Sequence, residues 1–199
     1  MKEFIRNYLN EVSEIAQKID NHEINEVAKE IIKIKENKGR IFFIGVGGSA
    51  GNASHAVCDL RKLTGIECYA PSDNVSELTA RTNDEGWDTI FSGWLKVSQL
   101  CEKDLIFVLS VGGGSREKNI SPGIVNALEL AKARESRIVG IVGKGEGYTR
   151  KVADASILVP PVNPSFITPH SESFQTVLWH LFASIPELKK YQTKWESVV

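Results

Sequence analysis

Two segments of this 199-residue chain carry histidines and carboxylates at a spacing suited to chemistry. His55 and Asp59 are four residues apart, so they share one face of an expected helix. Glu172, Thr176 and His180 follow at the same interval in another expected helix near the C-terminus. Each stripe alone is more often a solvated helix face. Together they supply two imidazoles and two carboxylates, which can bind a divalent transition metal such as zinc or perform acid–base chemistry.

Two glycine-rich turns are candidate anion sites, because each follows an apolar run expected to be a buried strand. The first turn surrounds a serine with glycines: Gly45, Gly47, Gly48, Ser49 and Gly51. The second turn and its flanks contain Ser110, Gly112, Gly113, Gly114, Ser115 and Ser121. Backbone amides at a helix start favour negative charge, and serine hydroxyls with bare amides suit a phosphate monoester. The competing interpretation is a pair of solvated turns. Parallel strands would bring both turns to one edge of a sheet, which favours the phosphate interpretation.

Nucleotide binding is the weaker interpretation of the first turn. Gly45 to Ala50 fits the pattern G-x-G-x-x-A, but Glu67 lies near the start of the next expected strand rather than at its end. No lysine of the triphosphate-binding type follows the turn. We therefore expect no nucleotide cofactor. Asn83 and Asp84 precede an expected helix, where they would cap it or bind sugar hydroxyls.

Alternating strand and helix patterns must position these residues. Strands are expected at 41–45, 66–70, 105–110, 138–142 and 157–159, and helices at 49–63, 76–81, 85–101, 121–134 and 170–184. This alternation predicts an α/β fold, a five-stranded parallel sheet with helices on both faces. Two amphipathic helices within residues 1–38 form an N-terminal helical hairpin before an α/β core at 40–188. The apolar stripe of this hairpin packs either against another subunit or against the rest of the same chain. We place no domain boundary in residues 1–199.

Composition excludes several partners. The net charge is −1, with 42% hydrophobic and 25% charged residues, so we expect no nucleic acid or membrane partner. No apolar run is long enough to span a bilayer. Cys58, Cys68 and Cys101 are odd in number and widely spaced, which favours reduced thiols in a cytoplasmic protein.

Together these motifs resemble the sugar isomerase (SIS) domain family, and within it the phosphoheptose isomerases, over nearly the whole chain. The family's opening loop, G-N-G-G-S-A, corresponds to residues 45–50, and its phosphate loop, S-T-S-G-N-S, to residues 110–115. The family places a histidine and an acid six and ten residues after the loop serine, as His55 and Asp59 stand here. Its Asn-Asp pair corresponds to Asn83 and Asp84. Its last helix carries a glutamine and a histidine eight residues apart, where this chain has Glu172 and His180.

The chain departs from the family pattern at several site positions. Val46 replaces an asparagine, while Asp59 and Glu172 replace a glutamate and a glutamine. Gly112 and Gly114 remove polar groups from the phosphate loop. The segment after Ser115 is longer, which leaves open whether Ser115 or Ser121 completes that loop.

The resemblance implies a three-layer, flavodoxin-like fold and a homotetramer. It implies isomerisation of D-sedoheptulose 7-phosphate to D-glycero-D-manno-heptose 7-phosphate, a precursor of bacterial surface heptose, through an enediol. Asp59 would be the base and His180 the acid. Zinc would be held by His55, Asp59, Glu172 and His180. Substrate would contact Gly47, Gly48, Ser49, Asn83, Asp84, Ser110, Gly112, Gly113, Ser115 and Ser121. The alternatives are another sugar-phosphate isomerase, or a non-catalytic regulator that binds a sugar phosphate or a protein.

Overall fold

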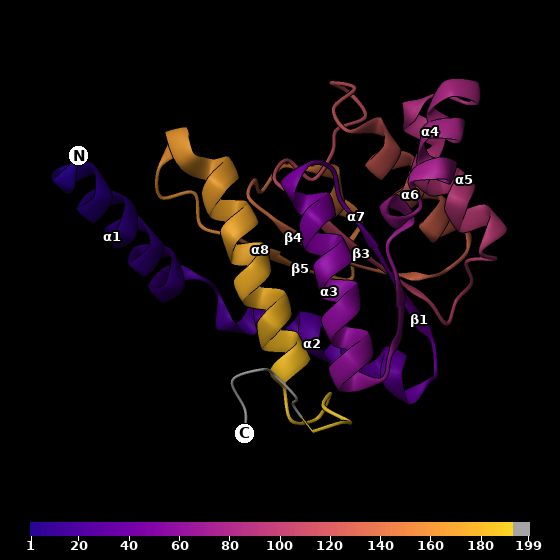
Figure 1. Cartoon of the computed structure of the whole chain (residues 1–199), viewed down its shortest axis with the longest axis horizontal. Helices are drawn as coiled ribbons and strands as arrows, with labels where there is room; N and C mark the ends of the chain where they lie inside the picture. The colour runs from indigo at the N-terminus through magenta and orange to yellow at the C-terminus, as the bar shows by residue number, and fades with distance from the viewer. Residues whose placement is uncertain (193–199) are drawn as a thin grey trace.

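Five parallel strands form one sheet at the centre of the structure, a computed structural model that describes residues 1–192 (Figure 1). The strand order is β2-β1-β3-β4-β5. The strands are β1 Arg40–Ile44, β2 Glu67–Tyr69, β3 Leu105–Ser110, β4 Arg137–Val142 and β5 Ala155–Leu158. The expected parallel sheet is therefore confirmed, with β2 shorter and β5 beginning earlier than the sequence pattern indicated.

Apolar runs form these strands because both faces of the sheet are covered. Ile41 and Phe43 of β1 point into one core, and Phe42 and Ile44 point into the other. A strand buried on both faces has to be continuously apolar, which is the pattern of residues 41–44 in β1 and 105–109 in β3.

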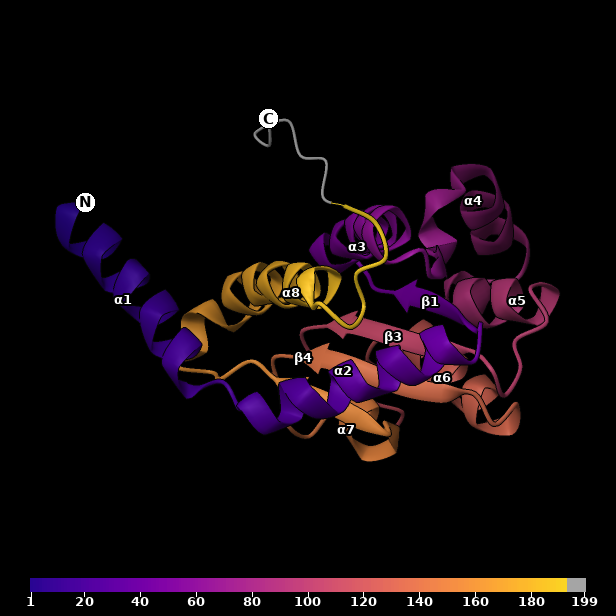
Figure 2. The ribbon, with the colours of Figure 1, turned by 90° about the horizontal axis from the view of Figure 1, so that it is seen from below.

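Helices cover the two faces and make a three-layer sandwich (Figure 2). The first core contains side chains of α2 (Asn21–Glu36), α3 (Gly48–Thr64) and α8 (Ile167–Ser184). The second core contains side chains of α4 (Val75–Asp84), α5 (Ile90–Val97), α6 (Pro122–Ala133) and α7 (Tyr148–Val152). The short 3-10 turns are η1 Pro71–Asp73, η2 Trp87–Thr89 and η3 Pro164–Phe166. None of the helices within residues 1–192 is long and apolar enough to cross a membrane.

The two expected N-terminal helices are present and differ in their packing. Buried residues of α2 pack into the first core, whereas α1 (Lys2–Lys18) contributes one buried residue, Ile15, near its C-terminal end and otherwise extends away from the sandwich (Figures 1 and 2). Phe4, Ile5 and Leu9 of α1 are 58%, 51% and 60% exposed. Part of the apolar stripe of α1 is therefore left uncovered by the chain.

The segment between β2 and β3 differs from the sequence expectation. Helix α4 begins earlier and ends later than 76–81, since Asn74 caps it by accepting a hydrogen bond from the Glu77 N–H at 3.2 Å. Gly86 then has φ +91°, a conformation that interrupts a helix. The expected helix at 85–101 is accordingly reduced to η2 and α5. Asn83 and Asp84 end α4 instead of preceding a helix.

The strand order has its topological switch point between β1 and β3. The chain leaves β1 into α3 on one face, and it leaves β3 into α6 on the other. Ligands of open α/β sheets bind at such a switch point, beyond the carboxyl ends of the strands. Both glycine turns follow these two strands.

Candidate active site

Helices α3 and α8 lie side by side, and Asn52 fixes their relative position. Its Nδ2 donates to the Glu172 carbonyl at 2.9 Å and to Gln175 Oε1 at 3.0 Å. Its Oδ1 accepts from Thr176 Oγ1 at 2.8 Å. Asn52 thus joins the two helices one turn before the histidines that each of them carries.

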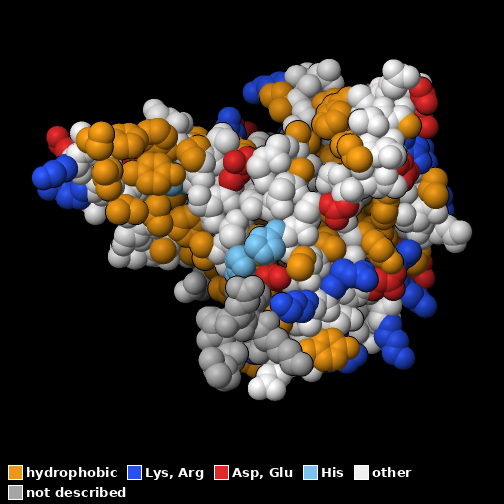
Figure 3. Space-filling model, viewed as in Figure 1, with side chains coloured by type: hydrophobic (Ala, Val, Ile, Leu, Met, Phe, Trp, Pro, Cys, Tyr) orange, Lys and Arg blue, Asp and Glu red, His pale blue; other side chains and the backbone are white. Residues whose placement is uncertain are grey.

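His55, Asp59 and His180 converge on one point between these helices. One potential ligand atom from each lies within 4.8 Å of the other two. Asp59 Oδ2 is 3.8 Å from His55 Nε2 and 3.7 Å from His180 Nε2. The Asp59 side chain is only 4% exposed, whereas His55 and His180 are 57% and 42% exposed. Figure 3 shows histidine side chains gathered on the exposed face over α3 and α8. The cluster is open on the histidine side and closed on the carboxylate side.

Neighbouring groups orient both imidazoles. His180 Nδ1 is 2.9 Å from the Thr176 carbonyl oxygen, and because a carbonyl only accepts, Nδ1 carries the hydrogen. Nε2 of His180 is then free to present its lone pair towards Asp59. Buried Trp179 packs against both rings, with centroids 4.5 Å from His55 and 3.5 Å from His180. Trp179 thereby restricts both ring planes, and the Thr176 carbonyl sets the tautomer of His180.

These three residues fit a divalent metal such as zinc. Asp59 Oδ2 is buried and has no hydrogen-bond partner within the described part of the chain. Zinc binds histidine nitrogen and carboxylate oxygen at about 2.0–2.2 Å, so tetrahedral ligands stand about 3.4 Å apart. The two observed separations from Asp59 Oδ2, 3.8 and 3.7 Å, need only a small adjustment. Three protein ligands would leave a position open for substrate.

Glu172 does not join this cluster in the structure, contrary to the four-residue set expected from the sequence. Its carboxylate lies against Gly48 at the first turn of α3, where an added Cβ would collide with both carboxylate oxygens. Glu172 stands eight residues before His180, about 12 Å along the helix axis. The amides and dipole of the α3 N-terminus attract a carboxylate there.

The first glycine turn is tightly packed against the end of β3. An added Cβ on Gly45 would meet the carbonyl oxygens of Ser49 and Leu109, and Gly47 has φ +65°. Ser49 is buried in the first turn of α3. Of the expected substrate contacts in this turn, Gly48 lies against the Glu172 carboxylate.

Hydrogen bonds fix the conformation of the second glycine turn, which borders a cavity. Gly113 and Gly114 have φ +69° and +78°. Gly113 N–H donates to Ser110 Oγ at 3.0 Å, and Thr149 Oγ1 donates to the Gly113 carbonyl at 2.8 Å. A cavity of about 230 Å³, which we name the loop cavity, is lined by Gly112, Gly114 and Ser115 among others. The cavity offers room for a small ligand beside this turn.

Three other expected substrate contacts lie apart from the loop cavity. Ser121 is the N-cap residue of α6 with φ +48°, and it is not among the residues lining the cavity. Asn83 donates to the Asp84 carboxylate at 2.7 Å. Within residues 1–192, no hydrogen bond joins Asn83 or Asp84 to either glycine turn.

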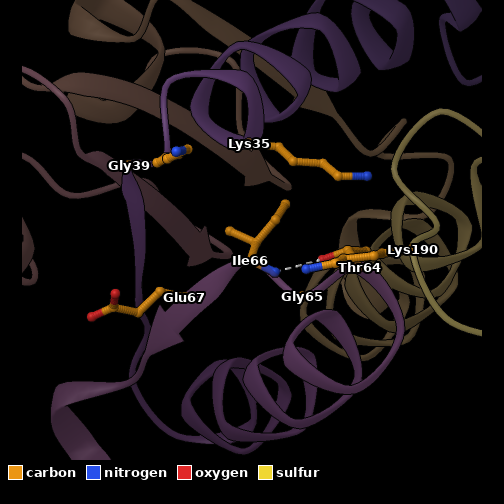
Figure 4. A pocket seen from close by; sticks show the side chains of 8 residues that line it. Lys35, Gly39, Thr64, Gly65, Ile66, Glu67 and Lys190 are labelled. Carbon is orange, nitrogen blue, oxygen red and sulfur yellow. Dashed lines mark hydrogen bonds between the residues drawn. The ribbon is translucent and has the colours of Figure 1, made fainter.

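A second cavity, of about 440 Å³, lies at the opposite edge of the sheet, where β1 and β2 begin (Figure 4). Two of its three lysines, Lys35 and Lys190, have partners. Lys35 Nζ donates to the carbonyls of Glu187 and Leu188, and Lys190 Nζ lies 5.2 Å from the Tyr191 ring centre. This cavity is remote from the histidine cluster, and we assign it no part in the chemistry.

Sequence reasoning missed two residues that shape the cluster. Asn52 precedes His55 by three residues and Asp59 by seven, so the polar stripe of α3 already contained it. Trp179 adjoins His180 in the chain, but nothing in the sequence pattern showed that its ring would contact both histidines.

Known proteins are similar to this chain in sequence and in fold. The family model described as the SIS domain matches residues 7–143. The phosphoheptose isomerase of Akkermansia muciniphila is 31% identical over 199 residues, covering 96% of this chain and 99% of that protein. The lincomycin biosynthesis protein LmbN of Streptomyces lincolnensis is 32% identical over 152 residues, which cover 71% of this chain and only 54% of that protein. The solved phosphoheptose isomerase from Neisseria gonorrhoeae shares the fold with a TM-score of 0.78 at 24% identity, covering 92% of this chain and 96% of that one.

Proposed function

The chain belongs to the SIS domain family, and from this premise we propose that it is an aldose–ketose isomerase acting on a sugar phosphate. The specific reaction we propose converts D-sedoheptulose 7-phosphate to D-glycero-D-manno-heptose 7-phosphate. Similarity to a phosphoheptose isomerase along nearly the full length of both chains supports this choice.

The observation that carries the proposal is the cluster of His55, Asp59 and His180. A buried carboxylate oxygen without a partner faces two oriented imidazole nitrogens. Isomerisation needs one group that removes a proton from carbon and another that moves a proton between two oxygens. A carboxylate and a histidine supply these two functions.

In this mechanism Asp59 takes the proton from carbon 1 of the ketose and returns it to carbon 2. A carboxylate has two oxygens, so one can face the histidines while the other accepts the proton. His180 exchanges a proton with the substrate oxygens through Nε2, because its Nδ1 hydrogen is held by Thr176. Phosphate binding at the second glycine turn uses remote binding energy to position the reacting carbons.

Zinc held by His55, Asp59 and His180 is the second form of the proposal, an alternative to proton exchange by His180, because its Nε2 cannot hold a metal and exchange a proton at the same time. Bound there, it would supply Lewis-acid polarisation of the substrate carbonyl. We propose that Glu172 orients substrate at the first glycine turn, since its carboxylate lies beside Gly48.

Metal analysis of the purified protein tests the cluster. We expect about one zinc ion per chain in the wild type and its loss in His180→Ala. His22→Ala, at an exposed histidine of α2, is the matched control and should retain the metal. If neither the wild type nor the control binds metal, zinc is excluded and the histidine acts by acid–base chemistry alone.

A different sugar phosphate is the second candidate, supported by the side chains around the glycine turns. Gly112 and Gly114 offer no side-chain hydroxyls to the loop cavity, and Val46 presents an apolar, 40% exposed side chain in the first turn. A panel of pentose, hexose and heptose phosphates separates the candidates. If kcat/KM is highest for a pentose or hexose phosphate, that sugar phosphate is the substrate in place of the heptose phosphate, and the protein is still an aldose–ketose isomerase.

A further inference from the structure

The side chains of Asn52 and Thr176 join α3 to α8 and have no part in the proton transfer proposed above. Thr176 has one hydroxyl hydrogen, and its Oγ1 is 2.8 Å from Asn52 Oδ1 and 3.4 Å from the Glu172 carbonyl oxygen. A helical threonine commonly donates to the carbonyl four residues earlier, which here belongs to Glu172. The shorter contact shows that the hydrogen points to the other helix instead. The hydroxyl of Thr176 therefore serves as a link between helices.

The amide of Asn52 is held in one orientation. The Glu172 carbonyl only accepts hydrogen bonds, so Asn52 Nδ2 faces it at 2.9 Å and Oδ1 faces the Thr176 hydroxyl. Nδ2 also donates at 3.0 Å to Oε1 of Gln175, whose side chain is fully buried. Three hydrogen bonds thus fix one side chain of α3 against one turn of α8.

These contacts lie beside the groups that are proposed to react. Asn52 precedes His55 by three residues and Asp59 by seven, so the three side chains share a face of α3. On α8, His180 Nδ1 donates to the Thr176 carbonyl at 2.9 Å. A path of two hydrogen bonds therefore runs from Asn52 through Thr176 to the imidazole of His180.

We propose that Asn52 is a positioning residue, which acts through Thr176 to set the distance between the His180 imidazole and the Asp59 carboxylate. That distance is 3.7 Å between Nε2 and Oδ2. The inference rests on the proposed function, because it takes these two groups to be the reacting pair. A displacement of about 1 Å at reacting groups lowers a rate by about a hundredfold. The loss of Asn52 should therefore lower kcat far more than it raises KM.

Steady-state kinetics on the full chain measures this difference. In Asn52→Ala, kcat should fall by about tenfold to a hundredfold, while KM stays within about threefold of the wild type. Thr176→Val keeps the shape of the side chain and removes the hydroxyl, so kcat should fall by a smaller factor. Thr176→Ser retains the hydroxyl and should recover most of that loss. Asn126→Ala is the matched control, since Asn126 Nδ2 also donates to a carbonyl of another element, that of Asp88 at 2.9 Å, and its kcat should not change.

A nuclear Overhauser effect between the rings of His55 and His180 measures the position of His180 without turnover. The two ring centroids are 5.5 Å apart, and the chain has only four histidines to label. The effect should be present in the wild type and in Asn126→Ala. It should be weakened in Asn52→Ala and in Thr176→Val, because α8 is then free to shift against α3. Thr176→Val decides the outcome if Asn52→Ala does not fold.

The two measurements distinguish this inference from the proposed function. An Overhauser effect that is unchanged in both variants would overturn the inference, whatever the kinetics. In an active enzyme, an unchanged kcat would also overturn it, with or without a raised KM, and would leave the isomerase intact. A wild type that isomerises none of the panel would overturn the function. A weakened Overhauser effect in both variants would then still support Asn52 as the residue that positions His180.

Discussion

At the scale of single residues, the proposed chemistry depends on how Asp59 is held. Its carboxylate is buried, its Oδ2 lacks a hydrogen-bond partner, and two imidazole nitrogens face it. A buried charge without compensation is costly, so the folded protein is expected to place a cation or a substrate hydrogen beside it. This unsatisfied atom identifies the point at which a ligand completes the site.

Ser115 and Ser121 are the two candidates for the serine that completes the phosphate contacts. Ser115 lines the loop cavity, whereas Ser121 stands at the N-cap position of α6 without a side-chain capping hydrogen bond and does not line the cavity. Ser115→Ala should raise KM by about three- to tenfold through loss of one hydrogen bond, and Ser121→Ala should leave KM near the wild-type value. Initial rates over a range of substrate concentrations measure both. A larger KM effect from Ser121→Ala would reverse the assignment.

The sequence predicted local site geometry better than geometry that depends on distant contacts. His55 and Asp59 are four residues apart in one helix and therefore share a face, so their proximity could be predicted without knowing the tertiary structure. Asp59 and His180 lie together as the two stripes indicated. The Glu172 carboxylate lies against Gly48, more than a hundred residues earlier in the chain, and outside the group formed by His55, Asp59 and His180, so its role as a metal ligand stays a prediction. Such a side-chain direction is decided by packing between helices.

At the scale of elements, the apolar runs predicted the sheet correctly. The helix boundaries were predicted less accurately, because capping and glycine residues determine where helices begin and end. Strands β1 and β3 are apolar over residues 41–44 and 105–109 because both faces are covered there. The boundaries between residues 71 and 101 were missed, since Asn74 and Gly86 outweigh the helical pattern there. The sequence pattern also did not reveal that Asn52 joins α3 to α8.

Ion pairs between buried Glu30 and two partly exposed cations couple α2 to the sheet and make stability depend on pH. Glu30 accepts from Arg137 Nε at 2.9 Å and from Lys33 Nζ at 2.8 Å. Burial alone would raise the pKa of Glu30, but these hydrogen bonds hold it below its ordinary value of 4.5. The stabilisation is therefore present above pH 4.5 and is lost as the pH falls through the lower folded-state value.

Glu30→Gln tests this coupling by urea denaturation. At pH 7 the free energy of unfolding should fall by about 1–2 kcal/mol, a figure reduced for the partly exposed partners. The difference from wild type should shrink at pH 4 and below. Glu14→Gln, in an exposed pair with Lys18, is the matched control and should have no measurable effect. An equal loss at every pH would show that Glu30 acts by packing alone.

At the scale of the whole molecule, α1 is the feature that the single chain leaves incomplete. Its exposed Phe4, Ile5 and Leu9 form an apolar surface beyond the sandwich (Figure 3). Exposed apolar patches of this kind are covered by association. We propose that the protein is a homotetramer with α1 in its interface.

Light scattering of Leu9→Glu measures this association. The wild type should have the mass of four chains, and the variant should form smaller species because a carboxylate cannot be buried there without a partner. Asn10→Glu, at an exposed polar position of α1, should keep the wild-type mass. A monomeric wild type, or a variant of unchanged mass, would remove α1 from the interface.

The isomerase itself is tested most directly by incubating the intact protein with D-sedoheptulose 7-phosphate in deuterated water. The proposed mechanism predicts D-glycero-D-manno-heptose 7-phosphate as product, with deuterium introduced at the carbon next to the new aldehyde. Asp59→Asn should lower the rate by about 10²- to 10⁴-fold, since a general base is removed. Neither product nor label from the wild type would contradict the proposed reaction.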